Sequence, residues 1–281
     1  MTGPGFAASL PDRAEVTAPD GVRISALLAG EENTGSPTVL AVHGFGSSAE
    51  GTWVATGHLA ALVRSGRRVV APDLRGHGRS GKPHDGAAYR FDTLLGDLRS
   101  VIDALIGPGR AVDVVGYSLG ARLSWSVAAD PSLRVRRLVL GGYDGRVLFE
   151  GVDTARLAGL LHDDPPEHVI AAGRAAARMS VDPTDRIAGI VHAVPGNDVR
   201  ALAALVAGLP GTVREDPEPQ MPTLVVAGDA DPLAVGAEIL AAGLPDGRFL
   251  SLPGRDHVSA VPASAFRRAV VEFLAETGSL G

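Results

Sequence analysis

The chain has 281 residues, of which 45% are hydrophobic and 21% are charged, so it can bury a sizeable globular core. Its formal charge of −6, without a dense lysine or arginine run, argues against nucleic acid or an anionic membrane as a partner. The absence of cysteine excludes disulfides, thiolate metal sites and a cysteine nucleophile. Residues 1–16 lack a signal-peptide pattern and no 18 apolar residues run together, so we expect a soluble cytoplasmic protein.

Six short apolar segments, rich in β-branched residues and closed by glycine or proline, are predicted as buried strands. They are residues 38–43, 68–71, 111–115, 135–140, 222–227 and 248–252. Segments with helical spacing of apolar residues, such as 94–105, lie between them. This alternation predicts an α/β fold with a mostly parallel central sheet, helices on both faces and functional loops at the carboxyl ends of the strands.

The alternation of strand and helix breaks once, between residues 145 and 220, over a segment too long for a loop. Residues 167–179 and 198–209 in it are rich in alanine, leucine and arginine and are predicted as helices. We interpret 145–220 as a helical cap inserted after the strand 135–140, which is the sixth strand of the chain if two further strands precede residue 38. The catalytic domain would then consist of residues 1–144 and 221–281.

The pentapeptide Gly116-Tyr117-Ser118-Leu119-Gly120 lies directly after a predicted strand and before an Ala/Leu-rich helical segment. A nucleophile elbow needs this context, because its serine sits on a sharp turn where glycines leave room for the strand and the helix to approach. A helix that begins after Ser118 also points backbone N–H groups at a developing oxyanion. We therefore predict Ser118 as the nucleophile and the Leu119 N–H as one oxyanion donor. The alternative, a chance match, is disfavoured by the flanking elements.

The first predicted strand is followed by His43-Gly44-Phe45-Gly46. In hydrolases whose serine lies on a nucleophile elbow, the loop at this place supplies the second oxyanion donor, a backbone amide. Phe45 N–H is the candidate, because glycines on both sides let the main chain approach a substrate. His43 is predicted to orient this loop.

The same stretch, Gly44-x-Gly46-x-x-Ala49, also fits the dinucleotide-binding fingerprint, so an NAD-dependent oxidoreductase is a remote alternative. That fingerprint needs a helix starting within it, whereas residues 47–51 are predicted as further loop. Its ribose-binding acid should lie about 20 residues on, and the acid that ends the second strand, Asp73, lies further away.

The candidate general base is His257, which follows the last predicted strand and should reach the same sheet edge as Ser118. The acid that holds its other ring nitrogen should come from between the serine and the histidine. Asp231, after the strand 222–227, is favoured. Asp229, two residues away, and Asp144, after the preceding strand, are the alternatives.

Five motifs together resemble the α/β-hydrolase fold family, in the branch of small serine hydrolases and cofactor-free haloperoxidase-like esterases. In chain order they are His43-Gly-Phe-Gly46, Pro72-Asp-Leu-Arg-Gly-His-Gly-Arg-Ser80, Gly116-Tyr-Ser-Leu-Gly120, Gly228-Asp-Ala-Asp231 and Gly254-Arg-Asp-His257. The resemblance implies eight strands, antiparallel only at the second, with the first two within 13–29. It also implies that 73–78 is a structural loop and that His77 has no catalytic role. In most members of the family the catalytic acid follows the strand after the cap, which corresponds to Asp231, and in some members it follows the strand before, which corresponds to Asp144.

These features predict a serine hydrolase that cleaves a carboxylic ester or related acyl bond of a small, largely apolar substrate, with no metal or organic cofactor. Family members that open epoxides or haloalkanes use an aspartate nucleophile, so Ser118 disfavours those activities. Carbon–carbon bond hydrolysis, a perhydrolase-type activity and a ligand-binding receptor that keeps the triad stay open. The sequence gives no indication of the oligomeric state.

Overall fold

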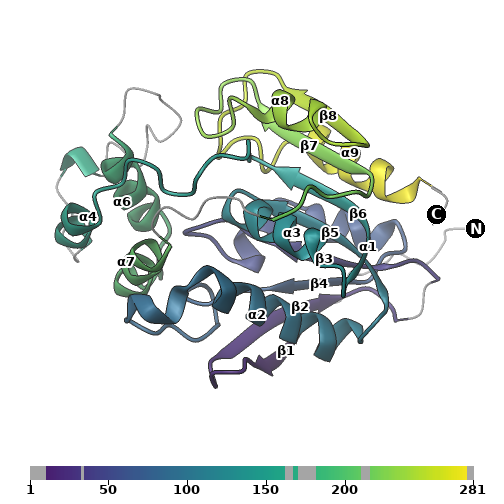
Figure 1. Ribbon diagram of the computed structural model, residues 1–281, viewed down its shortest axis with the longest axis horizontal. Helices are drawn as coiled ribbons and strands as arrows, with labels where there is room; N and C mark the ends of the chain where they lie inside the picture. The colour runs from purple at the N-terminus through teal and green to yellow at the C-terminus, as the bar shows by residue number, and fades with distance from the viewer. Residues whose placement is uncertain (1–10, 33–34, 162–166, 170–181, 210–215, 277–281) are drawn as a thin grey trace, which may run out of the picture.

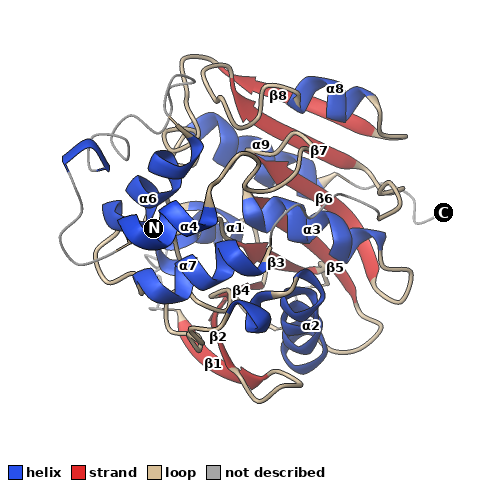
Figure 2. Cartoon of the chain, turned by 60° about the vertical axis from the view of Figure 1, so that its left-hand side comes forward, coloured by secondary structure: helices blue, strands red, loops and turns tan. Residues whose placement is uncertain are grey.

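The computed structural model describes residues 11–32, 35–161, 167–169, 182–209 and 216–276. Its centre is an eight-stranded sheet in the order β1-β2-β4-β3-β5-β6-β7-β8 (Figures 1 and 2). The strands are β1 (Asp12–Thr17), β2 (Arg23–Ala29), β3 (Thr38–Val42), β4 (Val69–Pro72), β5 (Ala111–Tyr117), β6 (Arg134–Gly141), β7 (Thr223–Gly228) and β8 (Gly247–Leu252). Strand β2 is antiparallel to both its neighbours and the other pairs are parallel. The predicted α/β fold, its six core strands and its antiparallel second strand are confirmed.

Helices connect the strands and cover the sheet. They are η1 (Glu50–Val54), α1 (His58–Arg64), η2 (Gly86–Tyr89), α2 (Phe91–Val101), η3 (Ile102–Ile106), α3 (Leu119–Ala129), α4 (Thr154–Leu160), α6 (Pro183–Ala193), α7 (Val199–Gly208), α8 (Ala237–Ala242) and α9 (Ser264–Ala275). Within the described ranges, no helix is long and apolar enough to cross a membrane.

The sheet separates two apolar cores, because successive side chains of a strand point to opposite faces. In β3, Leu40 and Val42 pack into the core under α2, α3 and α8, whereas Val39 and Ala41 pack into the core under α1 and α9. Figure 2 shows these two helical layers on either side of the strands. Burial on both faces explains why the strands are almost uniformly apolar, as expected for a parallel sheet.

The helices α4, α6 and α7, which lie between β6 and β7 in the chain, gather on the left in Figure 1, beyond the carboxyl ends of the parallel strands. They bury an apolar cluster of their own, including Leu157, Ile187 and Leu202. Helix α7 corresponds to the predicted helix 198–209, while most of the predicted helix 167–179 lies outside the described residues. The division of the chain at residues 145 and 220 stays a prediction, and we call α4, α6 and α7 the cap helices.

The prediction of a loop over residues 47–51 holds for Ser47 and Ser48 but is wrong from Ala49, where a helical turn starts that continues as η1. The physical reason is a buried carboxylate after β4. Asp73 Oδ1 accepts a hydrogen bond of 2.8 Å from the Ala49 N–H and so satisfies one amide at the start of the turn. This acceptor comes from a remote part of the chain, so no local sequence pattern indicated the turn.

Candidate active site

The predicted nucleophile Ser118 sits on a sharp turn between β5 and α3, with φ of 54° and ψ of −119°. The flanking glycines are sterically required. A Cβ at Gly116 would lie 2.4 Å from the Gly120 carbonyl oxygen, and a Cβ at Gly120 would lie 2.2 Å from the Val42 carbonyl oxygen. Backbone strain at a non-glycine residue is typical of functional positions. Here it presents the Ser118 side chain to the cavity described below.

The three residues predicted as a triad lie together. His257 Nε2 is 3.0 Å from Ser118 Oγ, and His257 Nδ1 is 2.8 Å from Asp231 Oδ2. Asp231 follows β7 and its side chain is fully buried, whereas His257 follows β8 and its side chain is 12% exposed. The parallel strands β5, β7 and β8 end at one edge of the sheet, and this brings together residues that are 139 and 26 positions apart in the chain.

Tyr117, the residue before Ser118, contacts the backbone of His257. The Tyr117 hydroxyl donates a 2.6 Å hydrogen bond to the His257 carbonyl oxygen, and the two rings lie side by side with centroids 5.3 Å apart. Burial raises the pKa of Tyr117 well above its usual value, so the phenol keeps its proton. Sequence reasoning assigned Tyr117 no role, because nothing local indicates a contact with a loop so far along the chain.

The two alternative acids bond elsewhere. Asp144 Oδ2 accepts from Arg146 Nε at 2.6 Å and from the Gly236 N–H at 3.3 Å. Asp229 is exposed, and its carboxylate accepts from the Gly254 N–H at 2.7 Å. Of the three candidate acids, Asp231 is thus the one that the structure places against His257.

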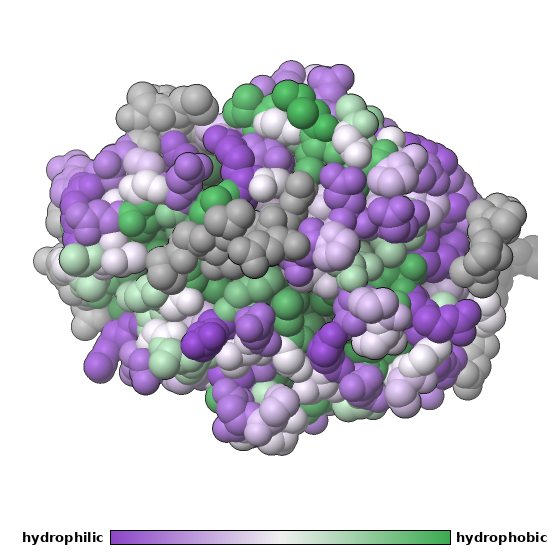
Figure 3. Space-filling view, viewed as in Figure 1, coloured by the Kyte–Doolittle hydropathy of each residue, from purple (hydrophilic) through white to green (hydrophobic). Residues whose placement is uncertain are grey.

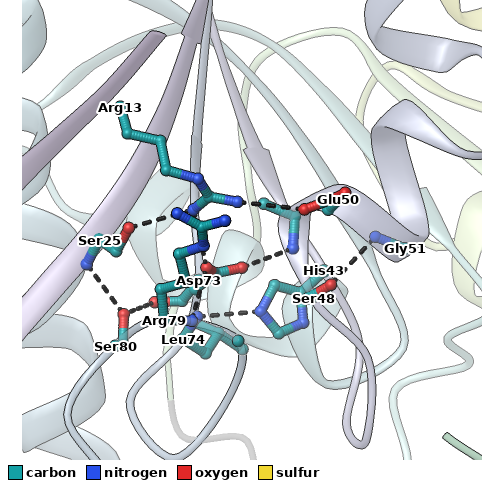
Figure 4. A network of polar contacts seen from close by, with 12 residues as sticks. Arg13, Ser25, His43, Ser48, Glu50, Gly51, Asp73, Leu74, Arg79 and Ser80 are labelled. Carbon is teal, nitrogen blue, oxygen red and sulfur yellow. Dashed lines mark hydrogen bonds and ion pairs between the residues drawn. The ribbon is translucent and has the colours of Figure 1, made fainter. Parts of the chain in front are cut away.

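The loop after β3 carries the predicted oxyanion donor Phe45, which lines the same cavity as Leu119 and Ser118. His43 Nδ1 donates to the Gly44 carbonyl oxygen at 2.7 Å, and His43 Nε2 accepts from the Leu74 N–H at 2.9 Å. The latter bond is visible in Figure 4. Because Gly44 and Phe45 share one peptide group, the bond to Gly44 also orients the Phe45 N–H.

A second buried histidine, His77, holds the next peptide group of this loop. Its Nε2 accepts from the Gly46 N–H at 3.0 Å, and its Nδ1 lies 3.1 Å from the Arg75 carbonyl oxygen. Burial lowers the pKa of His77 to about 3, helped by the neighbouring His43, whose own pKa is also lowered by burial. Both imidazoles are therefore neutral near pH 7 and position backbone. Sequence reasoning denied His77 a catalytic role but gave no indication of this contact.

Asp73 organises the base of this loop. Its carboxylate accepts from the Arg79 N–H at 3.0 Å and from the Arg13 guanidinium at 3.3 Å, in addition to the Ala49 N–H (Figure 4). Gly78 must lack a side chain here, since a Cβ would lie 2.3 Å from Asp73 Cγ. These bonds to backbone and to arginine make Asp73 a structural residue.

A cavity of about 730 Å³ lies between the cap helices and the catalytic edge of the sheet. Ser118 and His257 line it. Most of the remaining wall is apolar and much of it comes from residues 147–194, including Leu148, Phe149, Ile187 and Ile190. In Figure 3 hydrophobic residues gather at the centre of the face, between the cap helices and the sheet. The volume is typical of a site for a small organic molecule.

Comparison with known proteins identifies relatives of the same fold. Residues 37–157 match the family model described as the alpha/beta hydrolase fold. Epoxide hydrolase A from Mycobacterium tuberculosis is 30% identical over 210 residues, which cover 71% of this chain and 61% of that enzyme. The 2-hydroxy-6-oxo-2,4-heptadienoate hydrolase from Pseudomonas putida is 40% identical over 119 residues, which cover 42% of this chain and 41% of that enzyme.

Among solved structures, a hydrolase from Pseudomonas aeruginosa superposes with a TM-score of 0.72 at 26% identity, covering 96% of this chain and 100% of that one. The chain spans less than two thirds of the length of either curated relative. Residues 44–49, which also fit the dinucleotide fingerprint, lie inside the segment matched by the hydrolase model. That segment includes the loop after β3 and the serine elbow.

Proposed function

Because the chain belongs to the α/β-hydrolase fold family, we propose that it is a serine hydrolase that cleaves a carboxylic ester, or a related acyl bond, of a small and largely apolar substrate. The observation that carries this proposal is the hydrogen-bonded chain from Ser118 Oγ through His257 to the buried Asp231. A serine with an adjacent imidazole base, itself oriented by a carboxylate, is the arrangement that activates a hydroxyl for acyl transfer.

In the first step, Ser118 Oγ attacks the substrate carbonyl carbon while His257 Nε2 takes the hydroxyl proton. Asp231 holds the Nδ1 proton of the ring and stabilises the imidazolium. The negative charge that develops on the carbonyl oxygen is held by the N–H groups of Phe45 and Leu119. When the tetrahedral intermediate collapses, the alcohol leaves with the proton from His257 and the acyl group stays on Ser118.

In the second step, a water molecule attacks the acyl-enzyme and gives a proton to His257. Collapse of the second tetrahedral intermediate breaks the bond to Ser118, whose oxygen recovers that proton. The carboxylic acid is released and the site returns to its starting state. Each proton is thus exchanged between His257 and a reacting oxygen, and no metal or organic cofactor enters the cycle.

The cavity and the nucleophile narrow the choice of substrate. A mostly apolar wall of this volume favours a small and largely apolar substrate. Epoxide opening, named for the M. tuberculosis relative, is disfavoured because the elbow carries a serine where such enzymes of the family carry an aspartate. The second candidate is hydrolysis of a 2-hydroxy-6-oxo-dienoate, which the 40% identity to the P. putida enzyme favours.

The test is hydrolysis of p-nitrophenyl esters of increasing acyl length by wild type, Ser118→Ala and a control, Ser100→Ala. Ser100 is a matched control because it lies on α2, where its hydroxyl donates to the Gly96 carbonyl oxygen. We expect turnover by wild type and Ser100→Ala, and a loss of at least about a thousandfold in Ser118→Ala. Equal turnover by Ser118→Ala would refute the assignment of the nucleophile.

Failure of wild type on every acyl length would instead reject simple ester hydrolysis. The dienoate should then be assayed by the loss of its own absorbance. A protein that turns over neither substrate, yet is stabilised against heat by a small ligand, would have to be considered a receptor.

A further inference from the structure

The side chain of Asn197, between cap helices α6 and α7, bridges two parts of the chain. Its Nδ2 donates to the Gly46 carbonyl oxygen at 3.0 Å and to the Val191 carbonyl oxygen at 3.0 Å. Both acceptors are carbonyl oxygens, so only the amide nitrogen, with its two protons, fits this position. Asn197 therefore joins the end of α6 to the loop after β3 that carries the proposed oxyanion donor.

Three consecutive peptide groups of that loop are fixed in turn. His43 Nδ1 holds the Gly44 carbonyl, whose peptide group also contains the Phe45 N–H. His77 Nε2 holds the Gly46 N–H. Asn197 holds the Gly46 carbonyl in the following peptide group. The first two bonds come from the catalytic domain, but the third comes from the cap.

The third bond matters because Gly46 has little conformational restraint of its own. Its φ is +70°, in the left-handed region that glycine adopts without a steric penalty. Helix α6 packs close above it, so that a Cβ at Gly46 would lie 2.9 Å from Ile190 Cγ2. A flexible residue in contact with the cap thus follows directly after the residue whose amide must point at the oxyanion.

We propose that Asn197 is a positioning residue, which ties the oxyanion loop to the cap so that the Phe45 N–H is aimed at the reacting carbonyl when the cap is seated. This inference rests on the proposed function, in which Phe45 donates to the oxyanion. Donors of this kind stabilise the transition state only at hydrogen-bond distance from the developing charge, so a small displacement of the loop lowers the rate. Asn197 acts on the reaction through the loop and touches no reacting atom.

A second contact between the cap and the catalytic domain provides a matched control. His84 Nε2 lies 3.0 Å from Asp198 Oδ2, so the residue next to Asn197 is joined to the segment before η2. This contact also connects the cap to the catalytic domain, but it involves no atom of the oxyanion loop. Removing it loosens the cap without releasing Gly46.

The experiment compares Asn197→Ala and His84→Ala with wild type, using the best p-nitrophenyl ester. Loss of a whole oxyanion donor lowers kcat by about 10² to 10³-fold, and a displaced donor should cost less. We expect Asn197→Ala to lower kcat by about tenfold with KM changed by less than about twofold, and His84→Ala to leave both within about twofold. Asn197→Asp, which keeps the size but cannot donate, should behave like Asn197→Ala.

A second readout does not depend on turnover. Backbone hydrogen exchange in segment 44–47, followed by mass spectrometry, should be at least about fivefold faster in Asn197→Ala than in wild type or His84→Ala. Equal kcat values for the two alanine variants, or equal exchange in this segment, would overturn the positioning role. If wild type hydrolyses no ester, the proposed function fails, and exchange alone then decides whether Asn197 holds the loop.

Discussion

Two sets of loops bring histidine and aspartate side chains to the same edge of the sheet. One set follows β5, β7 and β8, and the other follows β3 and β4. The hydrogen bonds of the histidines differ between the two sets. In the first set, His257 bonds to two side chains, Ser118 and Asp231, and is partly exposed to the cavity. In the second set, His43 and His77 are fully buried and bond to backbone groups. The partners of the ring nitrogens are what single out His257 for the proposed role of general base.

This difference has an electrostatic side. A general base must accept a proton during the reaction, and His257 has a buried carboxylate beside it to stabilise that charge. The two buried histidines are in the opposite situation, since burial lowers the pKa of each and their backbone partners carry no full charge. They can hold the oxyanion loop only while they stay neutral. In the proposed mechanism the site thus combines one histidine that takes up and releases a proton with two that must stay neutral.

The largest expected effect concerns the acid. Asp231→Asn should lower kcat by about 10³ to 10⁴-fold, because an amide no longer stabilises the imidazolium or selects its tautomer. Asp144→Asn should cost less than about threefold, since Asp144 bonds to Arg146 and Gly236 instead. Steady-state hydrolysis of one p-nitrophenyl ester by both variants measures this. A larger loss at Asp144 than at Asp231 would move the acid to the end of β6.

The residues of the candidate triad could be selected from the sequence because each stands in a local pattern. Ser118 lies between two glycines after an apolar strand, and Asp231 and His257 each follow a strand that the alternation of apolar segments had identified. Parallel strands then bring their carboxyl ends to one edge by geometry alone. The fold and the candidate triad follow from these regularities.

The supporting contacts could not be predicted in the same way. The Tyr117 hydroxyl meets a backbone carbonyl 140 residues away, and Asn197 meets Gly46 from 151 residues away. Each contact depends on how packed elements approach in space, and no periodicity or spacing encodes it. The helical turn at Ala49 was missed for the same reason, because its stabilising carboxylate, Asp73, lies in the loop after β4, 24 residues along the chain.

A smaller effect is expected at Gly46. It shows whether the absence of a side chain there is needed for activity or only for the stability of the backbone conformation. Gly46 and Gly21 both have positive φ, 70° and 86°, so alanine at either should destabilise the fold by about 1 kcal/mol. A Cβ at Gly46 would also meet Ile190 at 2.9 Å, whereas a Cβ at Gly21 has nothing within 4 Å. We expect Gly46→Ala to lower kcat by about tenfold and Gly21→Ala to keep wild-type activity. Urea unfolding and ester hydrolysis, measured on the same preparations, separate the two effects.

The smallest expected effect is the contribution of His77 to the pH dependence of stability, which tests the contrast between the buried histidines and His257. The pKa of His77 is about 3 in the folded protein and should be near 6.5 when the chain is unfolded. Between these values the unfolded state binds a proton that the folded state does not, so stability is complete above pH 6.5 and is lost as the pH falls towards 3. One such group contributes a slope of at most about 1.4 kcal/mol per pH unit.

Replacing the group isolates its contribution. In His77→Gln the amide oxygen can still accept from the Gly46 N–H, but the side chain cannot be protonated. Urea unfolding between pH 5 and 6, where most carboxylates are ionised, should therefore give a shallower loss of stability in this variant, by about 1 kcal/mol per pH unit. Identical slopes for wild type and His77→Gln would mean that His77 is protonated in the folded protein. It could not then accept from Gly46, and the distinction drawn between the two sets of histidines would fail.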